Sequence, residues 1–365
     1  MIADRMQGFE ASGIRKVFDL ARKIKNPINL SIGQPDFDVP DEVKEEAIRA
    51  IDSGFNRYTI TQGIPELSKK ILQQTKLDKG VIADDIMITS GVAGALTLAF
   101  LVLINPGDEV LVPDPYFVSF KHLIKFCGGD IKFIDTYPDF ELTPSRIESY
   151  VSPRTKMLLI NSPSNPTGVV CRPEHLNEIC EIAKKNNLII ISDEIYSKFV
   201  YDTPYQSIGK FHENTLTCQG FSKSYAMTGW RLGSVIGPKN IINEMIKLQQ
   251  YTYICAPSFA QMAGIKALDI DISKYVEEYK MKRDFMYNAL KENYRVTKPD
   301  GAFYLFPQVP WGTDEEFATR AIDNKLLVIP GSVFSEKQSH FRLSYAAPFE
   351  TLQRGVEVLN SLVSR

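Results

Sequence analysis

Residues 156–196 read KMLLINSPSNPTGVVCRPEHLNEICEIAKKNNLIIISDEIY, and this stretch decides the fold. It contains two runs that are apolar on both faces, KMLLIN at 156–161 and LIIISDE at 188–194. Between them, residues 173–186 begin with proline and glutamate, as helices often do. A strand, a helix and a second strand in this order predict parallel strands in a sheet that helices cover on both faces.

The same alternation extends in both directions from this stretch. Short apolar runs precede polar turns and helical segments at four further places: IMIT (86–89), EVLVP (109–113), TLTCQGF (215–221) and GSVIG (233–237). Helices are predicted at 94–104 and 118–126. The sequence therefore predicts an α/β fold with a mostly parallel central sheet flanked by helices. In such sheets, ligands bind beyond the carboxyl ends of the strands.

The C-terminal part of the chain has a different pattern. A long amphipathic helix is predicted at 272–293, and shorter strands then alternate with a helix near 315–324 and a final helix. This pattern predicts a smaller α+β domain. A helix at 12–25, which precedes an extended segment, is expected to pack on the same domain. We therefore expect an N-terminal segment at 1–34 that packs on the small domain, a large domain at 35–270 and a small domain at 271–365.

Composition and charge restrict the classes of protein. The chain has 365 residues, 44% of them hydrophobic, and its net charge of −2 predicts neither nucleic acid nor a membrane as a partner. The start lacks the apolar core of a signal peptide, and apolar runs such as GALTLAFLVLI (94–104) are too short to span a bilayer. Five scattered cysteines without a C-x-x-C pair indicate a reduced, cytoplasmic protein.

Polar groups follow several of the predicted strands. In ITSGVAGAL, the backbone N–H groups of Gly91, Val92 and Ala93 open a helix and are suited to a phosphate, although small residues also serve close packing. Asn165 lies in the turn NSPSNPTG, where its amide either faces a ligand or stabilises the turn itself. Asp193 ends the most apolar strand, where a carboxylate needs a cationic partner unless it caps a helix.

A further strand leads into GFSKSYAMTGWRLG (220–233), which contains Ser222, Lys223 and Arg231. A carboxylate, a lysine, hydroxyl groups, an amide and a phosphate-binding turn at strand ends are the groups needed to hold pyridoxal 5′-phosphate. The sequence contains no G-x-x-x-x-G-K-[ST], G-x-G-x-x-G, G-x-S-x-G or H-E-x-x-H pattern. The four histidines stand in unrelated contexts, so we expect surface or capping roles for them and no metal site.

The segments LSIGQPDFDVP, NRYTITQGIPELSKKI, NSPSNPTGVV, SDEIYSKFVYD, GFSKSYAMTGWRLG, GAFYLFP, IPGSVF and FRLSYA follow one another along the chain. In order and spacing they resemble the class I aminotransferases of fold type I, especially the aspartate/prephenate, aromatic and kynurenine aminotransferases. The resemblance extends from about Ser12 to the C-terminus. It implies a pyridoxal-phosphate-dependent enzyme with a ping-pong cycle, in which an amino acid leaves as a 2-oxo acid before a second 2-oxo acid takes the amino group.

The resemblance also implies which residues hold the cofactor ring. Lys223 would form the Schiff base and move the Cα proton, a task for a lysine that loses its own proton readily. Asp193 would pair with the pyridinium N–H and keep the ring protonated. Asn165 and Tyr196 would donate hydrogen bonds to the phenolate oxygen, and Phe117 would stack on the ring.

By the same resemblance, the cofactor phosphate would be bound by a hydroxyl, a guanidinium and the amides of the helix start. The residues are Ser222, Arg231, Gly91, Val92 and Ala93. Tyr58 would reach the phosphate of the neighbouring subunit, which implies a homodimer with shared active sites. Arg342 in FRLSYA, with Asn165, would bind the substrate α-carboxylate, because a guanidinium makes two parallel hydrogen bonds to it. Gly33 would add a backbone donor and help the N-terminal segment cover the substrate.

The phosphate-binding turn departs from the bacterial aspartate/prephenate aminotransferases. Those enzymes resemble one another in a G-G-K-Q-A-L version, whose lysine contacts a side-chain carboxylate, and Ala93 replaces it here. Phe9, Phe37 and Tyr253 near the expected entrance favour an apolar pocket, although core packing explains them as well. We therefore expect an enzyme for aromatic or other apolar amino acids together with glutamate.

Four alternatives stay open or are disfavoured by the sequence. Aspartate aminotransferase activity is one. A carbon–sulfur β-lyase of the same fold is another, but such relatives have N-P-H-N-P where this chain has N-S-P-S-N-P. A non-catalytic regulator on this fold would need a DNA-binding domain, for which the residues before LSIGQPDF leave no room. A nicotinamide-dependent dehydrogenase would need the glycine fingerprint that the sequence lacks.

Overall fold

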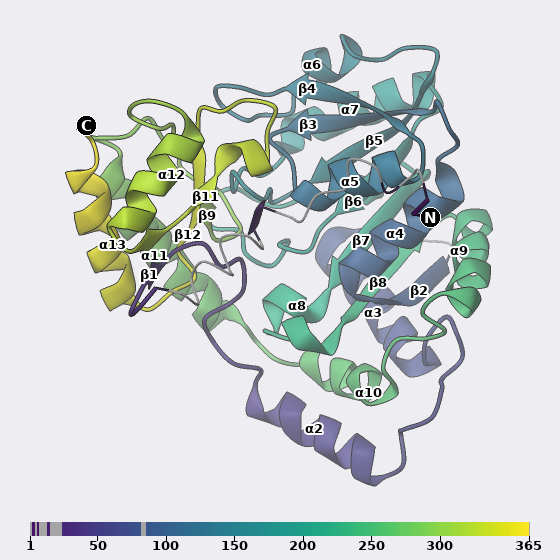
Figure 1. Cartoon of the computed structure of the whole chain (residues 1–365). Coiled ribbons are helices and arrows are strands. Elements are labelled where there is room, and N and C mark those ends of the chain that lie inside the picture. The colour runs from purple at the N-terminus through teal and green to yellow at the C-terminus, as the bar shows by residue number, and fades with distance from the viewer. Residues whose placement is uncertain (1, 4–5, 7–12, 15–23, 82–84, 365) are drawn as a thin grey trace.

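The structure is a computed structural model that describes residues 2–3, 6, 13–14, 24–81 and 85–364. A seven-stranded sheet forms the larger of two bodies (Figure 1). Its strands are β2 (Asp85–Ser90), β3 (Glu109–Asp114), β4 (Asp130–Asp135), β5 (Thr155–Asn161), β6 (Ile189–Asp193), β7 (Thr215–Gly220) and β8 (Leu232–Gly237). They lie in the order β2-β8-β7-β6-β5-β3-β4.

The predicted sheet is confirmed, with one addition. All six predicted strands are present, and β8 alone runs antiparallel to its neighbours β2 and β7, so the sheet is mostly parallel. The seventh strand, β4, was missed. Its sequence DIKFID alternates charged and apolar residues because it is the last strand on one edge, where most of its side chains stay accessible to solvent.

Helices cover both faces of this sheet. On one face lie α4 (Gly91–Leu103), α5 (Val118–Phe126) and α9 (Lys239–Tyr251), and on the other lie α6 (Pro144–Glu148) and α7 (Pro173–Lys185). The first helical residue of α4 is Gly91, three positions before the predicted start at Gly94. The helix therefore begins directly at the end of β2, and its free N–H groups lie at the carboxyl edge of the sheet.

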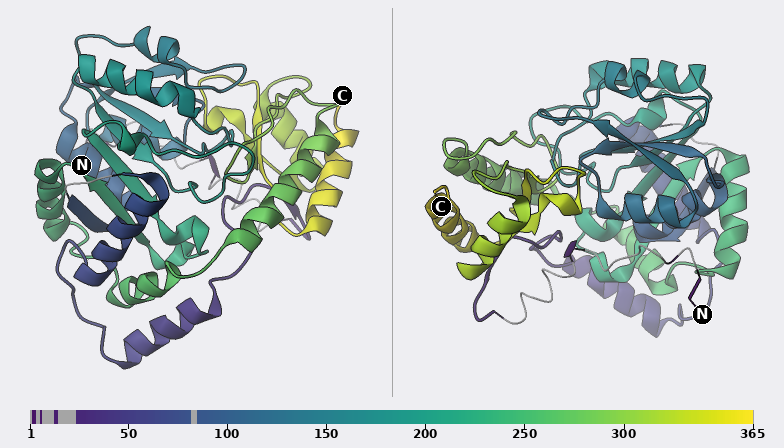
Figure 2. Two further views of the ribbon diagram at one scale, coloured as in Figure 1. Left: turned by 180° about the vertical axis from the view of Figure 1, so that it is seen from behind. Right: turned by 45° about the horizontal axis from the view of Figure 1, so that its top comes forward.

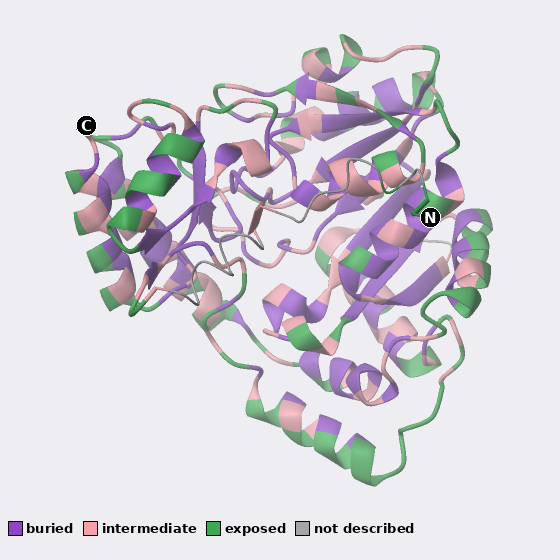
Figure 3. Cartoon of the chain, in the orientation of Figure 1, coloured by how far each residue is buried: buried purple, intermediate pink, exposed green. Residues whose placement is uncertain are grey.

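Three further helices of the larger body contact β2 or β8: α3 (Pro65–Lys79), α8 (Phe221–Ser224) and α10 (Ser258–Ala267). The helix α2 (Asp41–Asp52) packs on α10. In Figure 1, α2 extends along the bottom of the molecule beside α10 and away from both sheets. Its outer face is exposed, as the green colour in Figure 3 shows.

The smaller body is built on a three-stranded antiparallel sheet of β9 (Tyr304–Leu305), β11 (Ile329–Pro330) and β12 (Phe341–Ser344). Its helices are α11 (Ser273–Leu290), α12 (Asp314–Asp323) and α13 (Phe349–Ser361). Near the start of the chain, β1 (Ile28–Asn29) pairs in parallel with β10 (Leu326–Leu327), so this segment lies on the smaller body. The helix predicted at 12–25 lies mostly outside the described residues.

The two bodies lie side by side in both views of Figure 2 and share one apolar core. Phe199 of the larger body packs on Phe303 and Tyr279 of the smaller one, with ring centroids 5.9 and 5.3 Å apart. Because of this packing, the carboxyl ends of β5 and β6 face β9 and β12. Within the described part of the chain, we find no helix that combines the length and the apolar character needed to cross a membrane.

Candidate active site

A cavity of about 620 Å³ lies between the carboxyl ends of the central strands and the smaller body. All the predicted site residues except Gly91 and Tyr58 line it. They are Gly33, Val92, Ala93, Phe117, Asn165, Asp193, Tyr196, Ser222, Lys223, Arg231 and Arg342. They come from eight separate places in the chain, brought together by the sheet order and the docking of the smaller body.

Asp193 is the last residue of β6 and is 3% exposed. Its Oδ1 accepts a hydrogen bond from the N–H of Ile195 at 3.2 Å, and no ion pair to it is found among the described residues. Burial, together with the neighbouring Glu194 carboxylate, raises the pKa of Asp193 to about 7. The strand thus ends in a carboxyl group that is suited to a cationic partner from outside the chain.

Lys223 lies in α8, directly after β7, and its side chain points into the same cavity. Its Nζ donates a hydrogen bond to the carbonyl oxygen of Gly33 at 2.6 Å. Burial lowers the pKa of Lys223 to about 8, and the charges of Arg342 and Arg231 act in the same direction. At pH 7 about a tenth of this amine is therefore neutral, far more than in an exposed lysine, and a nucleophile requires the neutral form.

Arg342 on β12 is 1% exposed and lies between two aromatic rings. Its Cζ is 4.6 Å from the ring centroid of Tyr304 and 4.6 Å from that of Phe334. Nη1 donates to Oδ1 of Asn165 at 3.0 Å and Nη2 to the carbonyl oxygen of Ser31 at 2.8 Å, whereas Nε is buried without a partner. This buried guanidinium has no carboxylate within ion-pair distance among the described residues.

A second contact across the cavity joins Tyr196, in the turn after β6, to Tyr304 of β9. Their hydroxyl groups lie 2.8 Å apart, and both rings are buried. A Cβ atom at Gly33 would lie 2.6 Å from the Tyr304 hydroxyl, so only glycine lets the chain pass this close. The N-terminal segment thereby reaches both Tyr304 and the amine of Lys223.

The start of α4 faces Arg231 and forms the other end of the cavity. Gly91 has φ +67°, and a Cβ atom there would lie 2.6 Å from Nη2 of Arg231. Gly233 packs on the same turn, because its Cβ atom would lie 2.7 Å from the carbonyl carbon of Gly91. With Ser222 and Thr228 lining the cavity beside them, these groups form a cradle of backbone donors, hydroxyls and one guanidinium. Such a cradle is suited to a phosphate.

Comparisons with known proteins agree with this arrangement. The family described as aminotransferase class I and II matches residues 25–359 of the chain. The chain belongs to this family. Over 99% of its length it is 41% identical to a probable aspartate aminotransferase of Methanocaldococcus jannaschii, which is covered completely. It is 36% identical to aromatic-amino-acid aminotransferase 2 of Thermococcus litoralis, over 99% of this chain and 98% of that protein.

Solved structures show the same likeness. The aspartate aminotransferase of Thermus thermophilus, solved with maleate, superposes with a TM-score of 0.95 at 32% identity and covers 99% of both chains. The resemblance stated from the sequence is therefore confirmed, as are the fold type I architecture and the prediction that this protein is an aminotransferase.

Several cavity residues of this aminotransferase were not found from the sequence. Tyr304 belongs to GAFYLFP, which contributed to the resemblance but received no role. Asn161 ends β5, and its Nδ2 donates to the backbone carbonyl of Asp193 while its Oδ1 accepts the N–H of Asn165. It ties two functional turns together, and its position at a strand end was a usable signal. Thr228 and His122 also line the cavity.

Expectations about other side chains of the aminotransferase had mixed outcomes. His212 and His340 are buried rather than superficial, and burial lowers the pKa of His340 to about 4. Phe37 does not line the cavity but stacks on Tyr275 with centroids 3.8 Å apart, because the segment after Gly33 packs on α11. Tyr253 is 40% exposed and does not line it either. Phe9 lies outside the described residues.

Proposed function

We propose that this aminotransferase uses pyridoxal 5′-phosphate, carried covalently by Lys223. The observation that supports this most directly is the shared cavity of a buried carboxyl group, Asp193, and an amine of lowered pKa, Lys223. Asp193 would pair with the ring N–H and so acquire an ion-pair partner, which it lacks among the described residues. When bound, the cofactor supplies an electron-withdrawing ring that stabilises negative charge at the substrate Cα.

The cradle at the start of α4 would hold the cofactor phosphate. Backbone N–H groups of Gly91, Val92 and Ala93 lie at a helix N-terminus, where the helix dipole favours an anion. Ser222 and Arg231 would add a hydroxyl and a guanidinium. The close approach of Gly91 to Arg231 supports this role, since a side chain at position 91 would fill the space between them.

The ring itself would lie between β5, β6 and α5. Phe117 lines the cavity at the N-terminus of α5 and would stack on the ring. Asn165 and Tyr196 would donate hydrogen bonds to its phenolate oxygen. Burial raises the pKa of Tyr196 well above its ordinary value, so its hydroxyl keeps the proton that this donation requires.

Arg342 would bind the α-carboxylate of each substrate in turn, with Asn165 fixing one side of its guanidinium and Gly33 covering the site. The support is the guanidinium's burial without a carboxylate partner in the described chain, since a buried cation is costly until it is paired. Lys223, once released from the cofactor, would move the Cα proton, because a pKa of about 8 lets it accept and return a proton near neutral pH. A ping-pong cycle follows, since both substrates use the same arginine.

We also propose a homodimer that works in the cytoplasm. Tyr58 is 79% exposed and does not line the cavity of its own chain, which suits a role at the partner's phosphate. Several exposed apolar side chains lie near Tyr58 in the sequence, at residues 48–60, and others lie at residues 251–254. They include Ile48, Ile51, Phe55, Ile60, Tyr251, Tyr253 and Ile254. A patch of this kind is typical of a protein interface.

For the substrates, we propose aromatic or other apolar amino acids together with glutamate. The wall formed by α4 and α5 supports this choice, since it carries Ala93, Leu96 and Leu123 and no lysine or arginine among the described residues that line the cavity. An aspartate aminotransferase is the second candidate, because several similar proteins bear that name, the probable one of Methanocaldococcus jannaschii among them. The polar side chains of this wall are Thr97 on α4 and Ser119 and His122 on α5 among the described residues.

Two experiments test this proposal. Borohydride reduction of the cofactor-loaded protein, followed by peptide mapping, should place the label on Lys223, and a label on another lysine would reject the assignment. Separate addition of each amino acid to the loaded enzyme should change the absorbance of the bound cofactor only for true donors. Release of pyruvate or ammonia instead of a 2-oxo acid that retains the donor's carbon skeleton would indicate a β-lyase.

A further inference from the structure

Residues 334–337, which follow the short helix η4 (Gly331–Val333), connect the arginine of the cavity to the larger body. We call them the docking segment. Phe334, the first of them, is fully buried, and its ring lies against the guanidinium of Arg342 with 4.6 Å between Cζ and the ring centroid. The ring of Tyr304 lies at the same distance. The orientation of the guanidinium plane therefore depends on Phe334.

The docking segment is fastened to the end of β3. The backbone N–H of Tyr116 donates to the carbonyl oxygen of Phe334 at 2.8 Å, and the N–H of Glu336 donates to Oδ2 of Asp114 at 3.1 Å. The Glu336 carboxylate accepts hydrogen bonds from the Tyr116 hydroxyl at 2.7 Å and from Nζ of Lys121 at 2.5 Å. Lys121 lies on α5, the helix that Phe117 precedes.

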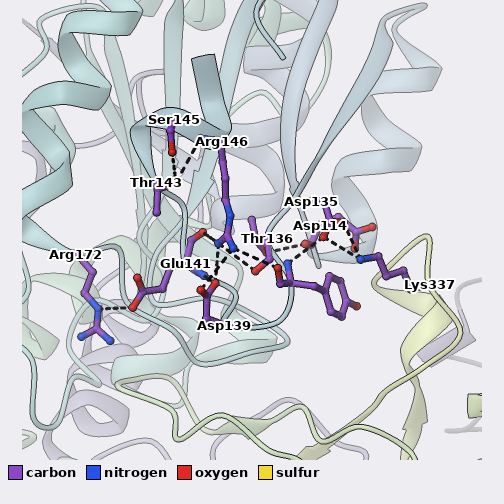
Figure 4. A network of polar contacts seen from close by, with 11 residues as sticks. Asp114, Asp135, Thr136, Asp139, Glu141, Thr143, Ser145, Arg146, Arg172 and Lys337 are labelled. Carbon is purple, nitrogen blue, oxygen red and sulfur yellow. Dashed lines mark hydrogen bonds and ion pairs between the residues drawn. The ribbon is translucent and has the colours of Figure 1, made fainter. Parts of the chain in front are cut away.

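A second attachment joins the segment to the end of β4. Nζ of Lys337 lies 2.8 Å from Oδ2 of Asp135 and 4.0 Å from the ring centroid of Tyr137. The Tyr137 and Ser335 hydroxyl groups lie 2.8 Å apart. Figure 4 shows Lys337 meeting Asp135 at one end of a network of polar contacts.

That network continues over the larger body. Figure 4 shows it running through Thr136 to Arg146, whose Nη1 donates to Oδ1 of Asp139 at 2.7 Å and to the carbonyl oxygen of Glu141. The Glu141 carboxylate accepts from Nε of Arg172 at 3.1 Å. The turns that hold the docking segment are therefore themselves fixed by the larger body.

We propose that the docking segment positions Arg342 for the substrate carboxylate, with Phe334 in contact with the guanidinium and Glu336 and Lys337 holding Phe334 in place. The proposal rests on the proposed function, in which Arg342 binds that carboxylate. A bidentate contact needs the guanidinium plane aligned with the carboxylate. Asn165 and the carbonyl of Ser31 fix two of its nitrogens, and the two aromatic rings fix its tilt. Phe334, Glu336 and Lys337 are thus positioning residues.

Binding of a carboxylate probe tests this directly. The probes are 3-phenylpropionate and succinate, which lack an amino group, and calorimetry on the cofactor-loaded protein gives Kd for whichever probe the parent protein binds. Phe334→Leu, which keeps an apolar side chain but no ring face, should raise Kd about three- to tenfold. Combined Glu336→Gln and Lys337→Met should raise Kd about tenfold, because the ion pairs that join these residues to Lys121 and Asp135 of the larger body are lost. KM should rise in parallel, with kcat changed less than about twofold.

A charge exchange and a matched ion pair separate positioning from general damage. Lys337→Glu alone should weaken binding of the probe. Adding Asp135→Lys should restore Kd to within about twofold of that of the parent protein. Lys247→Met removes an exposed ion pair on α9, with Glu244 at 2.5 Å, and should leave Kd unchanged. Arg342→Met should abolish probe binding. If Arg342→Met does so while Phe334→Leu and the Glu336/Lys337 variant bind as the parent does, the docking segment has no positioning role. If Arg342→Met binds the probe normally, the proposed function is at fault instead.

Discussion

The hydroxyl groups of Tyr196 and Tyr304 lie 2.8 Å apart, and their rings meet edge to face with centroids 5.6 Å apart. Tyr196 follows β6 of the larger body, whereas Tyr304 lies on β9 of the smaller one. A side chain proposed to hold the cofactor is therefore oriented by a residue whose ring lies against Arg342, the arginine proposed to bind the substrate carboxylate. The cavity is complete only when the two bodies are docked.

The first prediction concerns the amine of Lys223. Its pKa of about 8, lowered by burial and by the charges of Arg342 and Arg231, leaves a much larger neutral fraction at pH 8 than an exposed lysine has. The rate at which Lys223 of the cofactor-free protein reacts with an amine reagent should therefore rise through a midpoint near pH 8. Peptide mapping at a series of pH values measures this rate, with the peptides of other lysines as the comparison. A midpoint near pH 10 would contradict the prediction.

The second prediction concerns the stability cost of Asp193. Burial raises its pKa from 3.8 to about 7, so the folded cofactor-free protein binds a proton more tightly than the unfolded chain does. Stability should fall as pH rises from about 4 to about 7. Asp193→Asn removes the charge, so its free energy of unfolding should exceed that of the parent by ~2–4 kcal/mol at pH 8 and by little at pH 4. Urea unfolding at both pH values, with Glu244→Gln as an exposed control, measures the difference. If Asp193→Asn changed the free energy of unfolding equally at both pH values, the charge of Asp193 would not be the cause.

The third prediction concerns the ion pair behind Asp193. Nζ of Lys79 lies 2.7 Å from Oε2 of Glu194, whose side chain is fully buried, and Lys79 also donates to the Ser197 hydroxyl. Lys79→Met leaves the Glu194 carboxylate buried without its cation and should cost about 3–5 kcal/mol of unfolding free energy. Combined Lys79→Met and Glu194→Gln should cost clearly less than Lys79→Met alone. Denaturant unfolding of the parent, Lys79→Met and the double variant measures these differences. A double variant less stable than Lys79→Met would refute the argument.

Much of the site was predictable from the sequence because strand ends are local features. Asp193, Lys223 and Asn165 each follow an apolar run, so the rule that ligands bind beyond the carboxyl ends of strands located them without knowledge of the sheet order. The strand β4 escaped because its edge position leaves its charged residues in water, and no apolar run results.

Contacts between distant segments were not predictable in this way. Tyr304 meets Tyr196 across 108 positions, and Phe334 meets Arg342 because η4 turns the chain back over β12. The local sequences of Tyr304 and Phe334 do not distinguish them from ordinary aromatic residues of a core. His340 was expected at the surface because a single histidine carries no pattern, yet it stacks on Phe306 with centroids 5.1 Å apart. Such packing depends on the tertiary fold and leaves no periodic signal.

The fourth prediction tests the shared active site of the proposed homodimer. Tyr58→Ala and Lys223→Ala should each be inactive as homodimers, since every site then carries one lesion. Mixed dimers have one site with both lesions and one with neither, because Tyr58 serves the neighbouring site. Mixing the two variants should therefore recover up to about a quarter of the parent activity, since half of randomly paired dimers are mixed and each has one intact site. Mass spectrometry confirms that mixed dimers form. If they form and activity stays absent, each site is built from one chain.

The last prediction concerns substrate choice, which depends on a second contact because Arg342 is proposed to bind the carboxylate common to all substrates. A specialist for aspartate needs a cation for the side-chain carboxylate, since burying that group without a partner costs several kcal/mol. Among the described residues that line the cavity, the lysines and arginines are Lys223, Arg231 and Arg342, each with a proposed role of its own, and Ala93 supplies no charge.

We therefore expect kcat/KM for phenylalanine to equal or exceed that for aspartate, with glutamate also accepted. Steady-state measurements with phenylalanine, alanine, aspartate and glutamate and one common 2-oxo acid test this expectation. Ala93→Lys, which adds a cation to the wall of α4, should shift the ratio toward aspartate, and Ala93→Met serves as the control of similar size. An aspartate preference above about 100-fold in the parent, or roughly 2.7 kcal/mol in transition-state binding, would show that another cation reaches the pocket. His122→Phe would then test one source, since a loss of that preference assigns the charge to His122 and an unchanged preference places it outside the described residues that line the cavity.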